Sequence, residues 1–512
     1  MTNKKPKSPH KLFKNKTERL FFTKNRLSPF VNFLKYFKRV FVVLYFRLYR
    51  GFYENFPLIF TIRCDIMYKK YRFNQKRKKE RKMNADILEL LKSSLTPYHA
   101  VKEAEKLLLQ NGFEKLEESE KWNIKKHGKY YVVRDGSALI AFKTGEDFSF
   151  TITASHTDSP CFKLKGGNEF SDGNYLKFNV EKYGGGLFYS MLDIPLKVAG
   201  RIITEIDGKI LSIVAETDQT FAIPSVAIHF NRQANDGFKL NPQTDMQPLA
   251  GLVIPGIDRN SLTKILEKKY GGKILDFDLF ASPAITPVKY GFNDEFALAP
   301  RVDNLTSAFS SVEALIASNP KNVAMIYLAD NEEVGSRTKQ GAGSTFLKDI
   351  TERISLCLGI EREEYLSALA KSLLVSADNA HAIHPNHPEL SDKQNPVVLG
   401  GGLVIKHHAC GNYTTDGYSS ALIKHILNET GNKYQDFYMR SDLPCGGTLG
   451  AISSSQLSIR SVDVGMPQLA MHSACETFAP SDYDNAIKCF TAIFNAKIET
   501  KSYDETNVKI DD

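Results

Sequence analysis

The chain is organised around the stretch Asn322-Val323-Ala324-Met325-Ile326-Tyr327-Leu328-Ala329, which runs directly into Asp330-Asn331-Glu332-Glu333-Val334-Gly335-Ser336. The first part is a short apolar run, and such a run predicts a buried strand. The strand ends in three carboxylates within four residues. Carboxylates repel one another, and burying them without a partner is costly. A divalent cation beside them is the simplest explanation, and a solvated acidic turn is the alternative that this stretch alone leaves open.

Two further predicted strands also end in a side chain that could bind a metal ion. The run Phe148 to Ala154 continues into His156, and the run Leu373 to Ala377 ends at Asp378. In open α/β sheets, functional sites lie beyond the carboxyl ends of the strands. We therefore expect these side chains to lie near the acidic stretch.

Asp303, at the start of a predicted helix, and His472, just beyond a late strand, enlarge the candidate set to two histidines and at least three carboxylates. This mixture of nitrogen and oxygen ligands suits zinc, with cobalt or manganese as substitutes. Each residue alone has a more ordinary interpretation. Asp303 could cap its helix, and either histidine could be a buried, hydrogen-bonded residue. The combination is what favours a metal site.

The 512 residues suffice for two or three domains. Helix and strand patterns alternate before about residue 165 and after about residue 290. The intervening residues 165–289 instead show short β-rich runs separated by turn signals such as Gly184-Gly185-Gly186. This change predicts an α/β domain formed by residues 83–164 and 290–512, interrupted by an inserted β-rich domain at 165–289.

Residues 1–82 differ from the rest of the chain. They contain 24 Lys and Arg but 4 Asp and Glu, no alanine and 12 of the 33 phenylalanines. We expect this segment to be translated upstream sequence, with Met83 as the native start. A basic, aromatic segment lying on a membrane surface is an alternative, and an organelle-targeting presequence is a weaker one. Its longest uncharged apolar run, Val40 to Phe46, is too short to predict a membrane-spanning helix.

The rest of the chain is acidic, because it holds 43 of the 67 basic residues and 54 of the 58 acidic ones. We therefore expect no nucleic-acid partner for this part and no stable membrane insertion. The 7 cysteines are scattered without a CxxC motif. This pattern does not resemble a disulfide framework and favours a reducing, cytoplasmic location.

Five motifs, in this order, resemble those of the aspartyl aminopeptidase family of dinuclear zinc metallopeptidases, and the resemblance covers roughly residues 84–500. The motifs are His156-Thr157-Asp158-Ser159-Pro160, Arg301-Val302-Asp303-Asn304, Asp330 to Ser336, Ser376-Ala377-Asp378-Asn379-Ala380-His381 and Gln468-Leu469-Ala470-Met471-His472-Ser473. The resemblance implies an α/β metallopeptidase domain with a mixed β-sheet flanked by helices, interrupted by an inserted β-rich domain. It also implies removal of the N-terminal residue from peptide substrates and assembly as a dodecamer.

The resemblance implies two zinc ions and a role for each site residue. Asp303 bridges the two ions; His156 and Asp378 complete one site, and Glu333 and His472 the other. Asp158 orients His156, and Glu332 is the general base. The substrate-binding residues would be His229, which reaches the site of a neighbouring subunit, and His381, Lys406 and Tyr413, which line the pocket.

Adjacent side chains of an extended segment point in opposite directions, so Glu332 and Glu333 are expected to face different partners. The preferred N-terminal residue of the substrate stays open between Asp or Glu and other residues. The segment after the last histidine is Ala474-Cys475-Glu476, whereas family members that act on acidic residues often have a bulkier or basic segment there. Two alternative functions remain: a related dinuclear zinc deacylase or carboxypeptidase, and a catalytically silent assembly protein.

Overall fold

The computed structural model describes residues 86–237, 239–253 and 261–510. Residues 84–512 form one compact unit. The interpretations given for residues 1–82 lie outside the described residues. No helix in the described part of the chain combines the length and the apolar composition needed to cross a membrane.

The largest sheet has nine strands, and its central strands are parallel. The neighbouring pairs β2–β3, β3–β13 and β18–β16 are antiparallel, so the sheet is mixed. In spatial order the strands are β1 (Glu114–Lys115), β2 (Lys129–Arg134), β3 (Ala138–Lys143), β13 (Val323–Ala329), β4 (Phe150–His156), β14 (Leu373–Ala377), β18 (Arg460–Gly465), β16 (Leu403–His407) and β17 (Tyr434–Tyr438). The predicted buried strand is β13, and every one of its residues is buried.

Helices pack on both faces of this sheet because alternate residues of its central strands point in opposite directions. Ile326 and Leu328 of β13 join one apolar cluster, whereas Met325 and Tyr327 join another. The first cluster includes α3 (Ile87–Ser93), α4 (Pro97–Gln110), α7 (Val302–Ala317), α10 (Gly417–Glu429) and α12 (Pro480–Asn495). The second includes α8 (Phe346–Cys357), α9 (Arg362–Ala370) and α11 (Leu449–Leu457). The predicted α/β fold class is confirmed.

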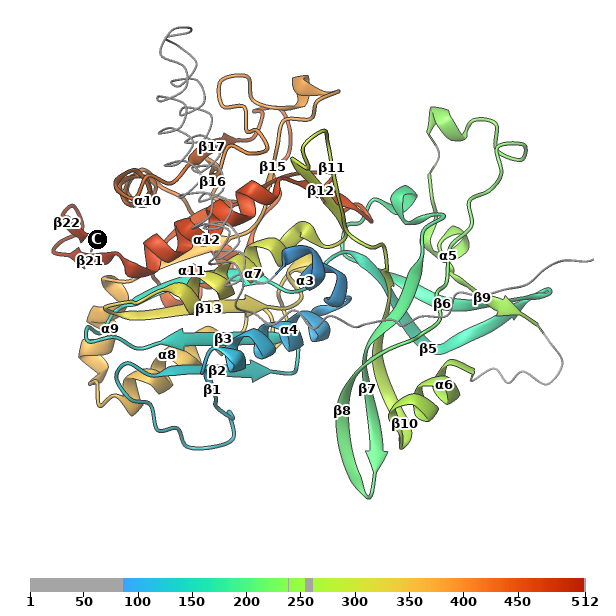
Figure 1. The fold of residues 1–512 in the computed structure, drawn as a ribbon, viewed down its shortest axis with the longest axis horizontal. Coiled ribbons are helices and arrows are strands. Elements are labelled where there is room, and N and C mark those ends of the chain that lie inside the picture. Colours follow the sequence, from blue (N-terminus) through green and yellow to red (C-terminus); the bar gives the residue numbers. More distant parts are fainter. Residues whose placement is uncertain (1–85, 238, 254–260, 511–512) are drawn as a thin grey trace, which may run out of the picture. The chain divides into compact units, whose positions relative to one another are not determined.

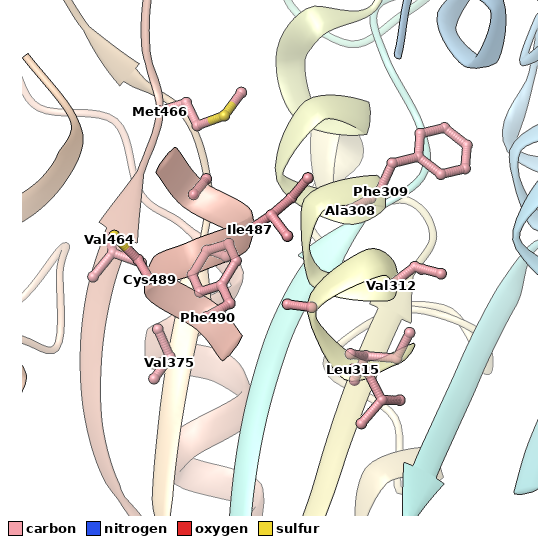
Figure 2. Packing of buried hydrophobic residues seen from close by; sticks show 14 of the residues in the cluster. Ala308, Phe309, Val312, Leu315, Val375, Val464, Met466, Ile487, Cys489 and Phe490 are labelled. Atoms are coloured by element: carbon pink, nitrogen blue, oxygen red, sulfur yellow. The ribbon is translucent and has the colours of Figure 1, made fainter. Parts of the chain in front are cut away.

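The helix that carries Asp303, α7, lies in the middle of the first cluster. Figure 2 shows its apolar side chains beside those of α12, next to Val375 of β14 and Val464 of β18. Phe309 and Val312 on α7 and Phe490 on α12 are almost fully buried. Because burial of such side chains stabilises by about 1.5–3 kcal/mol each, the position of α7 against the sheet is firmly set.

A second sheet has six strands, and all its neighbouring pairs are antiparallel. Its order is β8 (Lys209–Glu216), β7 (Leu196–Ile206), β10 (Lys273–Pro283), β5 (Cys161–Asp172), β6 (Tyr175–Tyr183) and β9 (Leu249–Leu252). The helix α6 (Ser261–Tyr270) and the short α5 (Pro242–Asp245) accompany these strands (Figure 1). This sheet has its own apolar cluster. The domain boundaries at 165 and 289 stay a prediction.

Two smaller sheets complete the fold. One has the order β11 (Val288–Tyr290), β12 (Phe296–Ala299), β20 (Glu476–Phe478), β19 (Pro467–Leu469) and β15 (Ala380–His381). The other pairs β21 (Lys497–Thr500) with β22 (Thr506–Lys509). Strands β19 and β20 flank the loop that contains His472, so the five-stranded sheet places this histidine near the ends of the central strands.

Candidate metal centre

The candidate ligands meet at one end of the central parallel strands. His156 is the last residue of β4, and Asp378 directly follows its neighbour β14. The acidic stretch follows β13, on the other side of β4. In the described residues, potential ligand atoms lie within 4.8 Å of one another in three groups. These groups are His156, Asp303 and Asp378; Asp303, Glu333 and His472; and His156, Glu332 and Glu333.

The two histidines present the same ring nitrogen to Asp303. His156 Nδ1 donates to the backbone carbonyl of Asp158 at 3.1 Å, and His472 Nδ1 donates to that of Gly185 at 3.1 Å. Because a carbonyl only accepts, each Nδ1 carries a proton, and Nε2 is the ring nitrogen that remains for a metal ion. The Nε2 atoms lie 3.5 Å from Asp303 Oδ1 and Oδ2, respectively.

Asp303 therefore stands between two sets of ligands, with one carboxylate oxygen facing each histidine. It lies in the first turn of α7, where the backbone dihedral angles of Asp303 and Asn304 depart from helical values. Arg301 is the residue that precedes α7, and Asp303 Oδ1 has no hydrogen-bond partner, so helix capping does not account for this oxygen. The Asp303 N–H donates to the buried carboxylate of Glu476 at 3.0 Å, which fixes the backbone at this position.

The acidic stretch forms a short 3₁₀ helix, η3 (Glu332–Val334), and not the extended segment that we expected from sequence. The left-handed residue Asn331 (φ 62°) turns the chain into it. Successive side chains of a 3₁₀ helix are about 120° apart, so Glu332 and Glu333 still diverge. The N–H groups of both glutamates donate to the two oxygens of Asp158 at 3.1 Å each. Asp158 thus contacts both the acidic stretch and His156, whose Nδ1 is 3.3 Å from its carboxylate.

Both glutamates lie near His156, and Glu333 also lies beside His472. Glu333 Oε1 lies 3.4 Å from His472 Nε2, whereas Glu332 and Glu333 share a potential ligand group with His156. Burial, reinforced by the carboxylate of Asp378 and opposed by His156, raises the pKa of Glu332 to about 7. Burial also raises the pKa of Glu333 well above its usual value.

The residues fit a divalent cation. Asp303 Oδ1 and Glu333 Oε1 are buried and have no hydrogen-bond partner, which is unusual for carboxylate oxygens. Burial raises the pKa of Asp378, and the neighbouring Asp303 adds to this effect. Several buried carboxylates with few cationic partners, beside the Nε2 atoms of two imidazole rings, form the mixed nitrogen and oxygen donor set that zinc prefers.

Of the four predicted substrate-binding residues, Lys406 lies beside Asp378 and Tyr413 lies beside Lys406. Lys406 of β16 is buried, and its Nζ is 3.8 Å from Asp378 Oδ1 and donates to the carbonyl of Asn379 at 3.3 Å. The Tyr413 ring lies 4.8 Å from the same Nζ, and His381 ends β15. The fourth, His229, lies on an exposed loop between β8 and β9, and the structure does not bring it to the metal centre of its own chain.

Sequence reasoning missed two residues that contact the ligand-bearing loops. Tyr183, from β6, donates its hydroxyl to Asp158 at 2.8 Å and accepts from Asn331 Nδ2 at 2.8 Å. Glu476 is buried and accepts from the N–H groups of Asp303 and His472. The adjacent glycines could have drawn attention to Tyr183, and the position of Glu476 four residues after His472 could have suggested a supporting carboxylate.

Comparison with known proteins identifies the family. Residues 90–494 match the family described as aminopeptidase I zinc metalloprotease (M18). A probable M18 family aminopeptidase 2 of Clostridium acetobutylicum is 38% identical over 436 residues, covering 82% of this chain and 100% of that relative. A relative of the same description from Pseudomonas paraeruginosa is 34% identical over 423 residues, covering 80% of this chain and 98% of its own length.

Solved structures agree with this relationship. A chain in the cryo-EM structure of the Ape4 and Nbr1 complex is 34% identical, with a TM-score of 0.75 over 80% of this chain and 84% of that chain. A chain of the S. cerevesiae mApe1 dodecamer is 26% identical, with a TM-score of 0.68 over 80% of this chain and 95% of that chain. An M18 family aminopeptidase from Thermotoga maritima shares the fold, with a TM-score of 0.72 at 24% identity, covering 80% of this chain and 95% of that chain.

The family match spans most of the chain and includes all five motifs, so the family expected from those motifs is confirmed. The chain therefore belongs to the M18 family of zinc metalloproteases, and it is an aminopeptidase.

Proposed function

We propose that this aminopeptidase uses two zinc ions per chain to hydrolyse the first peptide bond of its substrates, with Glu332 as general base. The observation that carries the proposal is the placement of Asp303, whose two carboxylate oxygens each lie 3.5 Å from a different histidine. His156, Asp303 and Asp378 would hold one ion, and Asp303, Glu333 and His472 the other. Cobalt or manganese would fit the same donor set.

When bound, the zinc ions would supply Lewis acidity, which activates a water molecule and polarises the scissile carbonyl. Glu332 accepts the proton of that water as its oxygen attacks the carbonyl carbon. It then delivers the proton to the leaving amine as the carbon–nitrogen bond breaks. The Asp158 carboxylate accepts from the backbone N–H of Glu332, which keeps Glu332 in place, and the same carboxylate orients His156.

The pocket residues support a preference for an acidic N-terminal residue. Lys406 places a buried ammonium group beside Asp378, and His381 and Tyr413 are close to it. A carboxylate of an N-terminal Asp or Glu would gain a charge-assisted hydrogen bond there, whereas an apolar side chain would leave the ammonium group without a new partner. The neighbouring carboxylate of Asp378 offsets part of the Lys406 charge, which reduces this preference for an acidic residue.

Chromogenic substrates test both parts of the proposal. The zinc-loaded enzyme should cleave Asp and Glu derivatives with a higher kcat/KM than Leu or Ala derivatives, and it should not cleave the same compounds with an N-acetyl group. Lys406→Met should reduce the difference between Asp and Leu while leaving Leu hydrolysis nearly unchanged. Hydrolysis of blocked substrates at equal rates would instead support a deacylase.

We also propose that the chain forms a homo-oligomer, as the S. cerevesiae mApe1 dodecamer does, with residues 165–289 as an inserted domain for assembly and substrate access. Apolar side chains beside His229 support this, because Val226, Ile228 and Phe230 are exposed by 63%, 47% and 87%. Exposed apolar groups of this extent mark protein contacts. His229 would then act in the site of a neighbouring subunit.

Subunit mixing tests this placement. His229→Ala and Glu332→Gln oligomers should each be inactive, because one lacks the contributed histidine and the other lacks the base. Dissociating and reassembling them together should restore part of the activity, since some sites then combine an intact Glu332 with an intact His229. Light scattering should give the mass of a dodecamer. No recovery in assemblies shown to be mixed would contradict a role between subunits.

A further inference from the structure

We propose that the segment Tyr183-Gly184-Gly185-Gly186-Leu187-Phe188-Tyr189-Ser190, called here the anchor segment, positions Glu333 and His472 and thereby sets the zinc affinity of their half of the metal centre. The proposal rests on the two-zinc function proposed above. The anchor segment begins at the end of β6 in the six-stranded sheet and ends within η1 (Phe188–Met191). No residue of the anchor segment has a role in the hydrolysis mechanism proposed above.

The first contact joins the anchor segment to the acidic stretch. The Tyr183 hydroxyl bridges Asp158 and Asn331, with both hydrogen bonds at 2.8 Å. Asn331 is the left-handed residue that turns the chain into η3. Since a side chain held on both sides cannot rotate freely, Tyr183 fixes the turn that directs Glu333 toward His472.

The second contact is steric and involves Gly184. Gly184 has φ +74°, and a Cβ atom placed on it would lie 3.1 Å from the Cβ of Glu333. That distance is tighter than ordinary van der Waals contact. Glycine thus lets the anchor segment pass directly against the side of Glu333 and restrict the direction of its side chain.

The third set of contacts joins the anchor segment to the His472 loop. The carbonyl of Gly185 accepts from His472 Nδ1, the N–H of Leu187 donates to the His472 carbonyl at 2.9 Å, and Ser190 Oγ accepts from the Ala474 N–H at 2.9 Å. His472 has a left-handed backbone (φ 66°), which is uncommon for a residue with a side chain. The surrounding bonds maintain this conformation and leave Nε2 free to face Asp303 and Glu333.

The other half of the metal centre is supported differently. His156 ends β4, and Asp378 follows β14, so their backbones are fixed by neighbouring strands of the nine-stranded sheet. Perturbing Gly184 or Ser190 should therefore weaken the zinc site of Glu333 and His472 while leaving that of His156 and Asp378 intact.

Two variants with matched controls test this separation. Gly184→Ala is compared with Gly173→Ala, because Gly173 also has a positive φ (+58°) but nothing within 4 Å of its added Cβ. Ser190→Ala is compared with Ser171→Ala, since Ser171 is an exposed residue of β5. The measurement is zinc bound per chain at fixed free zinc concentrations, set with a chelator, together with the thermal unfolding temperature at saturating zinc.

We expect Gly184→Ala to lower the affinity for one of the two zinc ions by roughly 10–100-fold, the range for groups that orient metal ligands. Ser190→Ala should lower the affinity for the same ion by less. To identify the site, Gly184→Ala is added to Asp378→Asn and to His472→Ala. It should weaken the remaining ion in the first background and leave it unchanged in the second.

Equal zinc affinities for Gly184→Ala and Gly173→Ala, or equal weakening of both ions, would overturn the proposal. If Gly184→Ala does not fold, equality of Ser190→Ala and Ser171→Ala would overturn it. A wild-type chain that binds fewer than two zinc ions would contradict the proposed function itself and the anchor segment with it. If the wild type binds two zinc ions but Gly184→Ala and Ser190→Ala bind zinc as tightly as their controls, only the proposal about the anchor segment would be wrong.

Discussion

The two halves of the proposed metal centre are built on different parts of the chain. His156 and Asp378 stand at the ends of neighbouring parallel strands of the nine-stranded sheet. Glu333 stands in the short helix η3 within the loop after β13, His472 stands on a loop, and the anchor segment at the end of β6 contacts both of them. One half thus depends on hydrogen bonds within a buried sheet, and the other depends on contacts from a second sheet. If two ions bind as proposed, a change in the anchor segment should affect the ion of Glu333 and His472 more than the other ion.

Asp303→Ala should have the largest effect, because it removes the group shared by both halves. Its carboxylate would offset the charge of two dications, so its loss leaves them repelling each other without a common anion. We expect zinc content near zero and activity at background. Metal analysis of the purified variant measures this, with circular dichroism as the control for folding. Two retained zinc ions would rule out the bridging role.

Glu332→Gln should separate chemistry from metal binding. Glutamine keeps the shape of Glu332 but cannot accept a proton, so kcat should fall by about 10²–10⁴-fold while zinc content and KM change little. Glu333→Gln is the matched comparison and should lose one zinc ion first, with activity following. Steady-state kinetics and zinc analysis of both variants, side by side, check these roles. The reverse pattern would mean that the two roles are exchanged.

The rate of zinc release to a chelator should distinguish the two halves of the proposed metal centre. The ion held by Glu333 and His472 should leave first, because its ligands lie on loops, and local opening favours loops over buried strands. Zinc release from the wild type should then show two phases. His472→Ala should keep only the slow phase, and Asp378→Asn only the fast one. A single phase of zinc release from the wild type would mean that both ions dissociate at the same rate, which would contradict the expected difference between the two sets of ligands.

Removal of the metal should make stability depend on pH, which is the smallest of the expected effects. Burial raises the pKa of Glu332 and Asp330 to about 7 and that of Glu476 to about 8, from ordinary values near 4. The folded apo-protein then binds more protons than the unfolded chain between these values. Its stability is therefore greatest at low pH within this range and decreases as the pH rises through about 7 to 8.

Differential scanning calorimetry checks this dependence. The unfolding temperature of the apo-protein should fall by a few degrees between pH 6 and 8, roughly the scale of a 1 kcal/mol change. The zinc-loaded protein is the control, and its unfolding temperature should change less, because the cation favours the ionised carboxylates. An apo-protein that becomes more stable over this interval would contradict the assignment of buried, unpaired carboxylates.

The sequence was sufficient to predict that His156 and Asp378 lie close together. Apolar runs that end at His156 and Asp378 are local patterns, and the rule that sites lie beyond parallel strand ends brings them together. The buried strand β13 was predicted for the same reason, since all its residues are apolar. The proposal that two ions share Asp303, and that Glu333 and His472 complete one of the two sites, needed the family resemblance, because spacing along the chain does not reveal a shared carboxylate.

The loop-borne half shows what local patterns miss. The hydrogen bond between Tyr183 and Asn331 joins residues 148 positions apart, and nothing near either residue predicts it. Glu332 and Glu333 were placed on an extended segment, whereas Asp158 accepts both of their N–H groups and stabilises a 3₁₀ turn. The helix α12, which packs against α7, was also not predicted. In each case a tertiary contact decides the local structure.

The most direct test of the account is a crystal structure of the zinc-loaded protein with anomalous diffraction measured on both sides of the zinc absorption edge. The account predicts two zinc peaks per chain that share Asp303, one bound by His156 and Asp378 and the other by Glu333 and His472. Glu332 should lie outside both coordination shells. A single peak, or an ion bound by Glu332 in place of Glu333, would contradict it.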